Sequence, residues 1–223
     1  MINRTSLFVI VTLAVGAPAA ARAMQSDGVP AAPEDGGPLN WEVTAGGGLK
    51  LRAGASTSAD VVATVPTGAI LDNLGCQRAE RRAWCYVQPF GGGPVGYVAA
   101  EYLQPSIGPD GGVAKGPDDS ALRAGKGDFD ATGKMPCAQD VGQPMGQCDF
   151  GVARHGGGFA TVVVTKSDGV KRALFFRRGA AIGADTSEAG GYQDFSATKE
   201  NDLNFIRVGA ERYEVPDAVV FGG

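Results

Sequence analysis

Histidine is almost absent from this chain, because His155 is the single histidine among 223 residues. Any Ser-His-Asp or Cys-His mechanism would depend on it. It follows Arg154 and precedes three glycines, so we expect it at an exposed hairpin tip, where a general base is not held in place. One histidine is also too few to anchor the usual zinc site of an amidase. We therefore expect a protein that is not an enzyme, with no catalytic residues, no metal and no cofactor.

Long apolar runs are equally scarce. The one candidate, residues 7–15, follows Arg4 and comes before an Ala21-Arg22-Ala23 cleavage pattern, an order typical of a secretory signal peptide. A run of this length does not cross a bilayer, which takes about 20 residues. We expect a signal peptide over residues 1–23 and an exported protein with no transmembrane segment, located in the periplasm or, as an alternative, secreted. No cysteine follows the cleavage pattern, which argues against a lipid anchor.

Positive charge is too sparse for a nucleic-acid partner. Arg4 and Arg22 are the only charged residues in the signal peptide, so 18 basic side chains remain against 24 acidic ones, a net charge of −6. Binding to polyphosphate relies on clustered lysine and arginine. The densest basic run, Arg78 with Arg81-Arg82, is interrupted by Glu80, and we interpret it as a solvated hairpin tip.

Turn-forming residues, in contrast, are abundant: the chain holds 35 glycines and 13 prolines, while its apolar fraction of 43% is ordinary for a folded protein. This composition favours two small β-rich domains over one large one. Segments rich in glycine, proline and aspartate separate them. We expect a flexible leader over residues 24–40, a first domain over 41–104, a linker over 105–119 and a second domain over 120–223.

The chain has only four cysteines. Cys76 and Cys85 flank a polar loop between two apparent strands, and Cys137 and Cys148 flank a loop rich in glycine and proline. Four cysteines allow three pairings, but the sequential pairing keeps each bridge within one domain and suits an oxidising compartment. The spacers of eight and ten residues are longer than those usual within a pair of zinc ligands. We predict two local disulfides.

The second domain shows the pattern of antiparallel hairpins. Residues 159–176 form two β-rich runs joined by Ser-Asp-Gly, and Asp-Gly between such runs marks a hairpin. A strand over 149–154 precedes them and makes a three-stranded meander. Further strands are expected over 203–208 and 212–216, with Pro216 at a strand end or edge. Short helical turns are expected only over 196–203 and around Leu122.

The first domain carries the most informative motif. Leu49 and Leu51, and then Val61, Val62 and Val65, predict two short half-buried strands with glycine- and proline-containing turns, and residues 95–103 close the segment as Val-Gly-Tyr-Val-Ala-Ala-Glu-Tyr-Leu. Over residues 41–104 the chain resembles a bacterial SH3 (SH3b) domain, a small β-barrel usually attached to cell-envelope proteins. Its Leu-Gly-Cys76 and Trp-Cys85 strands resemble those of exported SH3b proteins. The sequence departs from the family where Tyr97 replaces the usual tryptophan of Gly-Trp-Val.

The resemblance implies that four aromatic side chains lie near the grooves of the barrel: Trp84, Tyr86, Tyr97 and Tyr102. Aromatic faces offer flat area for sugar rings or peptide backbones at low entropic cost. The alternative role is structural, because Trp84 and Tyr97 can equally fill the small core. The pattern does not decide between the two roles while the register of the strands is unknown.

The fold expected from the sequence is all-β: a small SH3-like barrel followed by a second β-rich domain of antiparallel hairpins. The function expected is that of an exported cell-envelope binding protein, which recognises peptidoglycan or a protein or peptide ligand. One alternative is an inhibitor-like module whose acidic second domain blocks a basic lytic enzyme, inserting a loop such as residues 186–192. Another is a hydrolase with an unrecognised pair of carboxylates.

Overall fold

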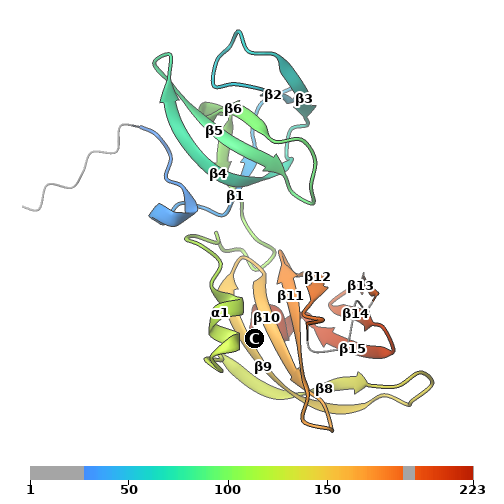
Figure 1. Ribbon diagram of the computed structural model, residues 1–223. Coiled ribbons are helices and arrows are strands. Elements are labelled where there is room, and N and C mark those ends of the chain that lie inside the picture. The colour runs from blue at the N-terminus through green and yellow to red at the C-terminus, as the bar shows by residue number, and fades with distance from the viewer. Residues whose placement is uncertain (1–27, 188–193, 223) are drawn as a thin grey trace, which may run out of the picture.

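The structure is a computed structural model that describes residues 28–187 and 194–222. It contains two units, each built on one antiparallel sheet, and no strand is shared between them (Figure 1). The all-β expectation is confirmed, with only short helices beside the strands. Within the described part of the chain, no helix is long and apolar enough to cross a membrane. The expected signal peptide, residues 1–23, lies outside the described residues.

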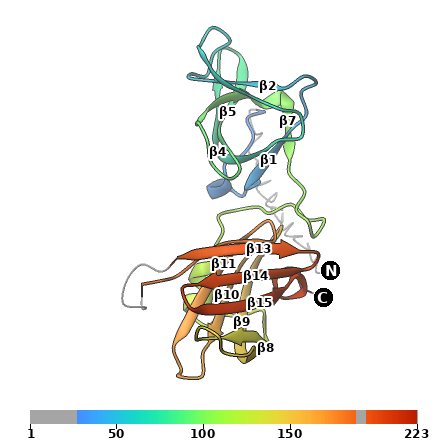
Figure 2. The ribbon, with the colours of Figure 1, turned by 90° about the vertical axis from the view of Figure 1, so that its right-hand side faces the viewer.

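The first sheet has seven strands in the order β3-β2-β6-β5-β4-β1-β7 and curls nearly into a barrel (Figure 2). Two turns of 3-10 helix accompany it. In chain order the elements are η1 (Pro33–Asp35), β1 (Asn40–Val43), β2 (Leu49–Arg52), β3 (Val61–Val65), β4 (Ile70–Ala79), β5 (Arg82–Pro89), β6 (Gly96–Ala99), η2 (Ala100–Tyr102) and β7 (Leu103–Pro105).

The alternation along β2 places its residues on two faces. Leu49 and Leu51 are buried in the barrel core, and Lys50 between them points outward to solvent. The expectation that β3 is half-buried holds for Val65 but is wrong for Val61 and Val62, which are 47% and 45% exposed. The reason is position, since β3 is an edge strand of the sheet and pairs only with β2.

The β4–β5 hairpin carries the first predicted disulfide. Cys76 lies directly opposite Cys85 in the strand register and is bonded to it, which confirms the pairing. The strands continue to Ala79 and Arg82, so only two residues form the turn. Both have positive φ angles, 51° for Glu80 and 66° for Arg81, as the two-residue hairpin turn that matches the twist of the strands requires.

Residues 28–40 of the segment expected as a flexible leader lie within the described residues. Its η1 turn lies beside the barrel, and Pro33 is buried. The side-chain amide of Asn73 on β4 donates hydrogen bonds to the carbonyl oxygens of Ala31, at 3.1 Å, and Pro38, at 2.9 Å. These bonds satisfy backbone acceptors of the leader and bind it to the barrel.

The second sheet has eight strands in the order β12-β11-β10-β9-β8-β15-β14-β13, and its end strands β12 and β13 lie in contact, so the sheet wraps around its own core. Two short helices accompany it. In chain order the elements are α1 (Ser120–Gly125), β8 (Ala131–Ala138), β9 (Gly146–Gly156), β10 (Phe159–Thr165), β11 (Lys171–Arg177), β12 (Ala180–Ala184), β13 (Phe195–Glu200), β14 (Leu203–Val208), β15 (Glu211–Pro216) and α2 (Asp217–Phe221).

The predicted hairpins of this domain are confirmed, including the β9–β10–β11 meander and the β14–β15 hairpin. The helix expected around Leu122 is α1. The helical turn expected over 196–203 is wrong, because β13 and a turn occupy these residues. Pairing with β14 and burial of Ala197 against the core outweigh the weak local helix preference.

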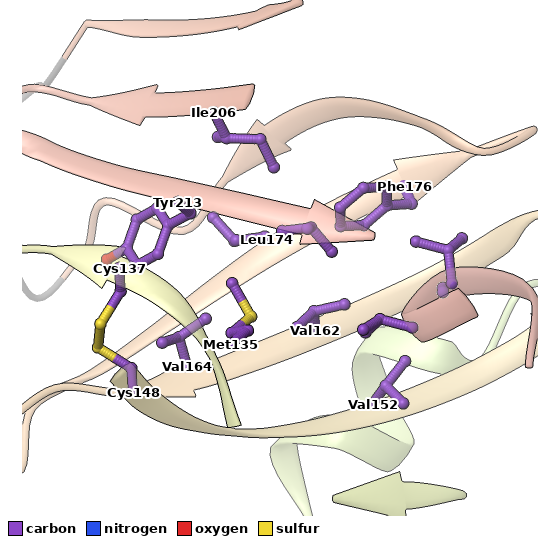
Figure 3. Close-up of a cluster of buried hydrophobic side chains, with 14 of the residues drawn as sticks. Met135, Cys137, Cys148, Val152, Val162, Val164, Leu174, Phe176, Ile206 and Tyr213 are labelled. Atoms are coloured by element: carbon purple, nitrogen blue, oxygen red, sulfur yellow. A yellow bond between two sulfur atoms is a disulfide. The ribbon is translucent and has the colours of Figure 1, made fainter. Parts of the chain in front are cut away.

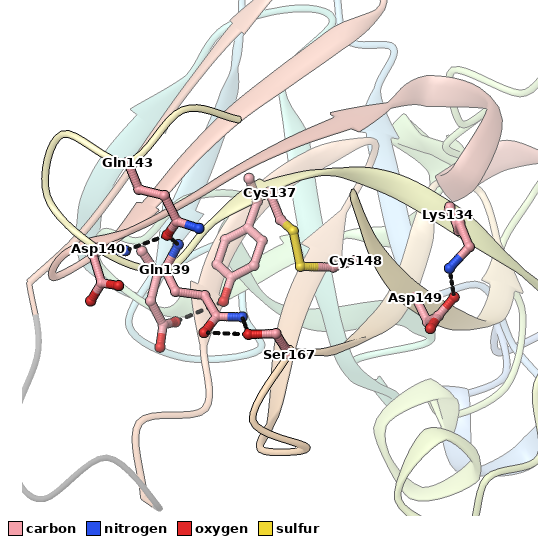
Figure 4. Close-up of a disulfide and its surroundings, with 10 residues drawn as sticks. Lys134, Cys137, Gln139, Asp140, Gln143, Cys148, Asp149 and Ser167 are labelled. Atoms are coloured by element: carbon pink, nitrogen blue, oxygen red, sulfur yellow. Dashed lines mark hydrogen bonds and ion pairs between the residues drawn. A yellow bond between two sulfur atoms is a disulfide. The ribbon is translucent and has the colours of Figure 1, made fainter. Parts of the chain in front are cut away.

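The core of the second domain lies between the two halves of the sheet (Figure 3). Strand β10 is buried on both of its faces. Val162 and Val164 point into the main core. Val163 points the other way, into a small cluster with Ala124 of α1 and Ala153 of β9. Helix α1 therefore covers the outer side of this part of the sheet, as Figure 1 shows. The second predicted disulfide, Cys137–Cys148, joins β8 to β9 at the edge of the core (Figure 4).

A cluster of charged side chains is buried in the same domain. The Glu211 carboxylate accepts hydrogen bonds from the Arg172 guanidinium at 2.8 and 2.9 Å, from Lys166 Nζ at 3.0 Å and from the Tyr213 hydroxyl at 2.7 Å. Burial alone raises the pKa of Glu211, but these bonds outweigh it and hold the pKa at about 2. Burial and the bond to Glu211 raise the pKa of Tyr213.

The two units meet along a seam made by the end of β11. Arg177 forms an ion pair with Asp72 of β4 at 2.7 Å, and its guanidinium lies 4.9 Å from the centre of the Phe90 ring. Arg178 donates to the Ser106 hydroxyl at 2.8 Å and to the carbonyl of Ile107 at 3.1 Å. The segment expected as a linker, residues 105–119, is thus bound to the second unit through Ser106 and Ile107.

Candidate functional site

The four aromatic candidates lie on or beside one outward face of the barrel. On β5, Cys85 and Val87 point into the core, so Trp84 and Tyr86 point to the other side. Tyr86 is paired directly with Tyr97 of β6, and their ring centres are 4.9 Å apart. Trp84 is paired with Ala99. Tyr102 follows on η2 and is 41% exposed.

The small side chain of Ala99 leaves a hollow in this face. A cavity of about 310 Å³ lies there, lined by Trp84, Tyr102 and Ala99 together with residues of β2 and the loops around it. Trp84 is only 2% exposed, yet it lies outside the barrel core and forms part of the wall of this cavity. The sequence left open whether Trp84 fills the core or lines a groove; in the structure its side chain is buried and also forms part of the cavity wall.

Three cationic side chains also line the cavity, and the sequence reasoning did not find them. They are Lys50 and Arg52 of β2 and Arg82 of β5. Lys50 and Arg52 lie on the outward face of β2 because they alternate with the buried Leu49 and Leu51. Arg52 is also paired with Tyr97 of β6. Arg82 lies two residues before Trp84 on β5 and therefore on the same face. The alternation of Leu49-Lys50-Leu51-Arg52 was visible in the sequence. The missing information was the β2–β6–β5 order, which brings these three residues to the tryptophan.

The electrostatics of the cavity favour an anionic ligand. Arg82 is 3.5 Å from Glu101, a pair that is about half exposed, and its guanidinium lies 6.0 Å from the Trp84 ring. Arg52 donates to the carbonyl of Ala59 at 2.7 Å, which holds its side chain in position, and it forms no ion pair with any residue that the structure describes. The Trp84 Nε1–H is buried and has no acceptor among the described residues.

The histidine and the four cysteines, which were the candidates for catalysis or metal binding, all make contacts within the fold. The expectation that His155 lies at an exposed hairpin tip is wrong. It lies near the end of β9, its side chain is 13% exposed, and its Nδ1 is 3.4 Å from Asp119 Oδ1. Both cysteine pairs are disulfides, and the described residues contain no free cysteine. They also contain no group of three or more histidine, cysteine or carboxylate residues that could hold a metal ion.

The inhibitor and hydrolase alternatives depend on a loop and on carboxylates of the second domain. Most of the loop considered for an inhibitor, residues 186–192, lies outside the described residues. Among the carboxylates of the last forty residues, Glu211 is held in the buried cluster, and Asp217 pairs with Lys199 at 2.7 Å.

Comparison with protein families identifies the first unit. Residues 47–104 match the family model of the bacterial SH3 domain. Comparison of the chain with curated proteins and with solved structures gave no match. The match covers the elements from β2 to η2 and all the cavity-lining residues except Ala45 and Gly46. Residues 47–104 of the first unit thus form a bacterial SH3 domain, which holds most of the cavity.

Proposed function

We propose that this is an exported, non-catalytic binding protein of the cell envelope, and that the cavity of its SH3 domain holds peptidoglycan. The observation that carries the proposal is the placing of Lys50, Arg52 and Arg82 around the Trp84 indole and the Tyr102 ring. Peptidoglycan offers both complements, because its stem peptides carry carboxylates and its sugars present flat faces. Aromatic rings bind such faces, and guanidinium groups bind carboxylates in a bidentate manner.

The disulfides support the assignment to an exported protein. Two bridges, Cys76–Cys85 and Cys137–Cys148, take up all four thiols of the chain. Such bridges form and persist in oxidising compartments such as the periplasm. They also leave no thiol to act as a nucleophile. The proposal therefore assigns recognition to the SH3 domain and no reaction to either domain.

Co-sedimentation of the purified protein with purified peptidoglycan tests the proposal. We expect Arg52→Gln and Arg82→Gln each to weaken binding about tenfold, since a charge-assisted hydrogen bond contributes roughly 1.5–3 kcal/mol. Arg81→Gln is the matched control, because Arg81 is the neighbour of Arg82 but points into solvent at the hairpin turn. Binding should also weaken as salt concentration rises.

Unchanged binding by the Arg52→Gln/Arg82→Gln double variant would refute the role of the cavity. Binding by neither the wild-type protein nor the variants would refute peptidoglycan as the ligand. A soluble peptide ligand of the same cavity would then be sought by the quenching of Trp84 fluorescence, and the same variants would test it.

A further inference from the structure

The outer face of β13, β14 and β15 carries two rows of polar and aromatic side chains. The inner face of these strands is core, where Ala197, Ile206 and Tyr213 are packed. The alternate residues therefore point outward, and the strand register places them side by side. The first row is Ser196–Arg207–Arg212, and the second row is Thr198–Phe205–Glu214.

The first row sets two like charges directly opposite each other. Arg207 and Arg212 are a cross-strand pair, and like charges in this position destabilise a sheet. Within residues 28–187 and 194–222, neither guanidinium lies in an ion pair, although Asp and Glu are numerous in the domain. An uncompensated pair of this kind is the arrangement that a bound anion stabilises.

Arg212 is held in place for such a role. One of its Nη atoms donates to the carbonyl of Gln143, in the loop between β8 and β9. That loop is itself ordered, because the Gln143 side-chain oxygen accepts from the backbone N–H of Gln139 at 2.8 Å and of Asp140 at 3.0 Å (Figure 4). The Nε–H of Arg212 is buried and has no acceptor among the described residues.

A cavity of about 330 Å³ lies over these two rows. Met145, from the end of the ordered loop, and Phe205 give it an apolar side. The hydroxyl-bearing Ser196 and Thr198 lie along β13. Glu214 stands opposite Phe205 and has no ion pair within the described part of the chain. Its negative charge next to the arginines disfavours a dianion such as phosphate and favours a ligand with a single negative charge.

We propose that this cavity, which we name the β13–β15 pocket, is a second binding site that takes the C-terminal carboxylate of a short peptide. The carboxylate lies against the guanidinium groups of Arg207 and Arg212. The apolar side chain of the last residue packs on Phe205 and Met145. The site is on a different sheet from the SH3 cavity and shares no residue with it.

An NMR titration of the purified protein with N-acetyl-Ala-Ala tests the proposal. We expect shifts of the backbone amide signals of β14 and β15, and weaker binding by at least tenfold when the probe is the C-terminal amide of the same dipeptide. Arg207→Gln should weaken binding of the acid to the same degree. It should leave the melting temperature unchanged or raise it, because the like-charge pair is relieved.

The control variant is Arg52→Gln, which disables the SH3 cavity and should leave this titration unchanged, so failure of one site is distinguishable from failure of the other. Equal binding of the acid and the amide, or no shift in β14 and β15, would overturn the proposal. Inorganic phosphate is the second probe. Shifts of these strands with phosphate but not with N-acetyl-Ala-Ala would also overturn it, because the site would then select a dianion.

Discussion

The buried cluster around Glu211 leads to a quantitative prediction for stability. Replacement of Glu211 by glutamine keeps the shape of the side chain but removes its charge. The substitution removes the buried carboxylate that accepts from Arg172 and Lys166, whose side chains are 3% and 12% exposed. Breaking a buried ion pair from one side costs about 3–5 kcal/mol. We expect the free energy of unfolding at pH 7 to fall by that amount.

The pH dependence follows from the pKa of Glu211, which the cluster lowers from 4.5 to about 2. A depressed pKa means that the folded state prefers the ionised carboxylate, so the stabilisation is fully present above pH 4.5 and is lost as pH falls to about 2. This lowering of the Glu211 pKa corresponds to about 3 kcal/mol of folding free energy. The difference in free energy of unfolding between wild type and Glu211→Gln should stay constant from pH 7 to 5 and should then become smaller as the pH falls.

Denaturant unfolding at a series of pH values, followed by far-UV circular dichroism, measures both effects. Glu214→Gln is the matched control, because it removes the same charge from the same strand at a residue that has no ion pair in the described part of the chain. We expect the control to change stability by less than about 0.5 kcal/mol. If Glu211→Gln lowers the free energy of unfolding by less than about 1 kcal/mol at pH 7, or if this loss does not shrink in acid, the stabilising role of the Glu211 cluster is refuted.

Three further predictions concern the framework. Replacement of the Cys137–Cys148 disulfide by two alanines opens a link across a sequence separation of 11 residues and should lower the free energy of unfolding by about 3 kcal/mol, as measured in denaturant. The Arg177→Ala/Arg178→Ala double variant removes the ion pair to Asp72 and the hydrogen bonds to Ser106 and Ile107 and should loosen the seam, so that 15N relaxation reports separate tumbling times for the two units; a single tumbling time would contradict this. Gly151→Ala would place a Cβ atom 2.4 Å from the Phe129 ring and should lower the free energy of unfolding in denaturant by about 1–3 kcal/mol. Gly146→Ala, whose Cβ atom would lie in ordinary contact, 3.8 Å from the Cys137 carbonyl oxygen, should lower it by less than about 1 kcal/mol.

Local patterns were sufficient to predict most of the fold. The hairpins were marked by turn residues between alternating runs, and both disulfides followed from the spacing of Cys76, Cys85, Cys137 and Cys148. These signals lie close together in the sequence. The helical turn expected over 196–203 failed for the opposite reason. The pairing of β13 with β14 and the burial of Ala197 against the core decide its structure, and a short polar segment carries little signal of either.

The sites were predicted less completely, because they depend on strand order. The aromatic side of the SH3 cavity was expected from the resemblance, but Lys50, Arg52 and Arg82 join it only through the β2–β6–β5 arrangement. The same holds for Arg207 and Arg212. They stand five positions apart in the sequence and face each other only because β14 and β15 form a hairpin in that register. A shift of one residue would send one of them into the core.

The seam at Arg177 and Arg178 has a consequence for avidity. The seam fixes the separation and the relative orientation of the SH3 cavity and the β13–β15 pocket. A ligand held in one cavity would therefore meet the other cavity at one fixed distance. A rigid connection raises the effective concentration at the second site only for ligands whose two groups have the matching spacing. If both proposed sites bind one polymer, this fixed distance would favour, between two polymers that carry the same chemical groups, the one whose repeat matches it.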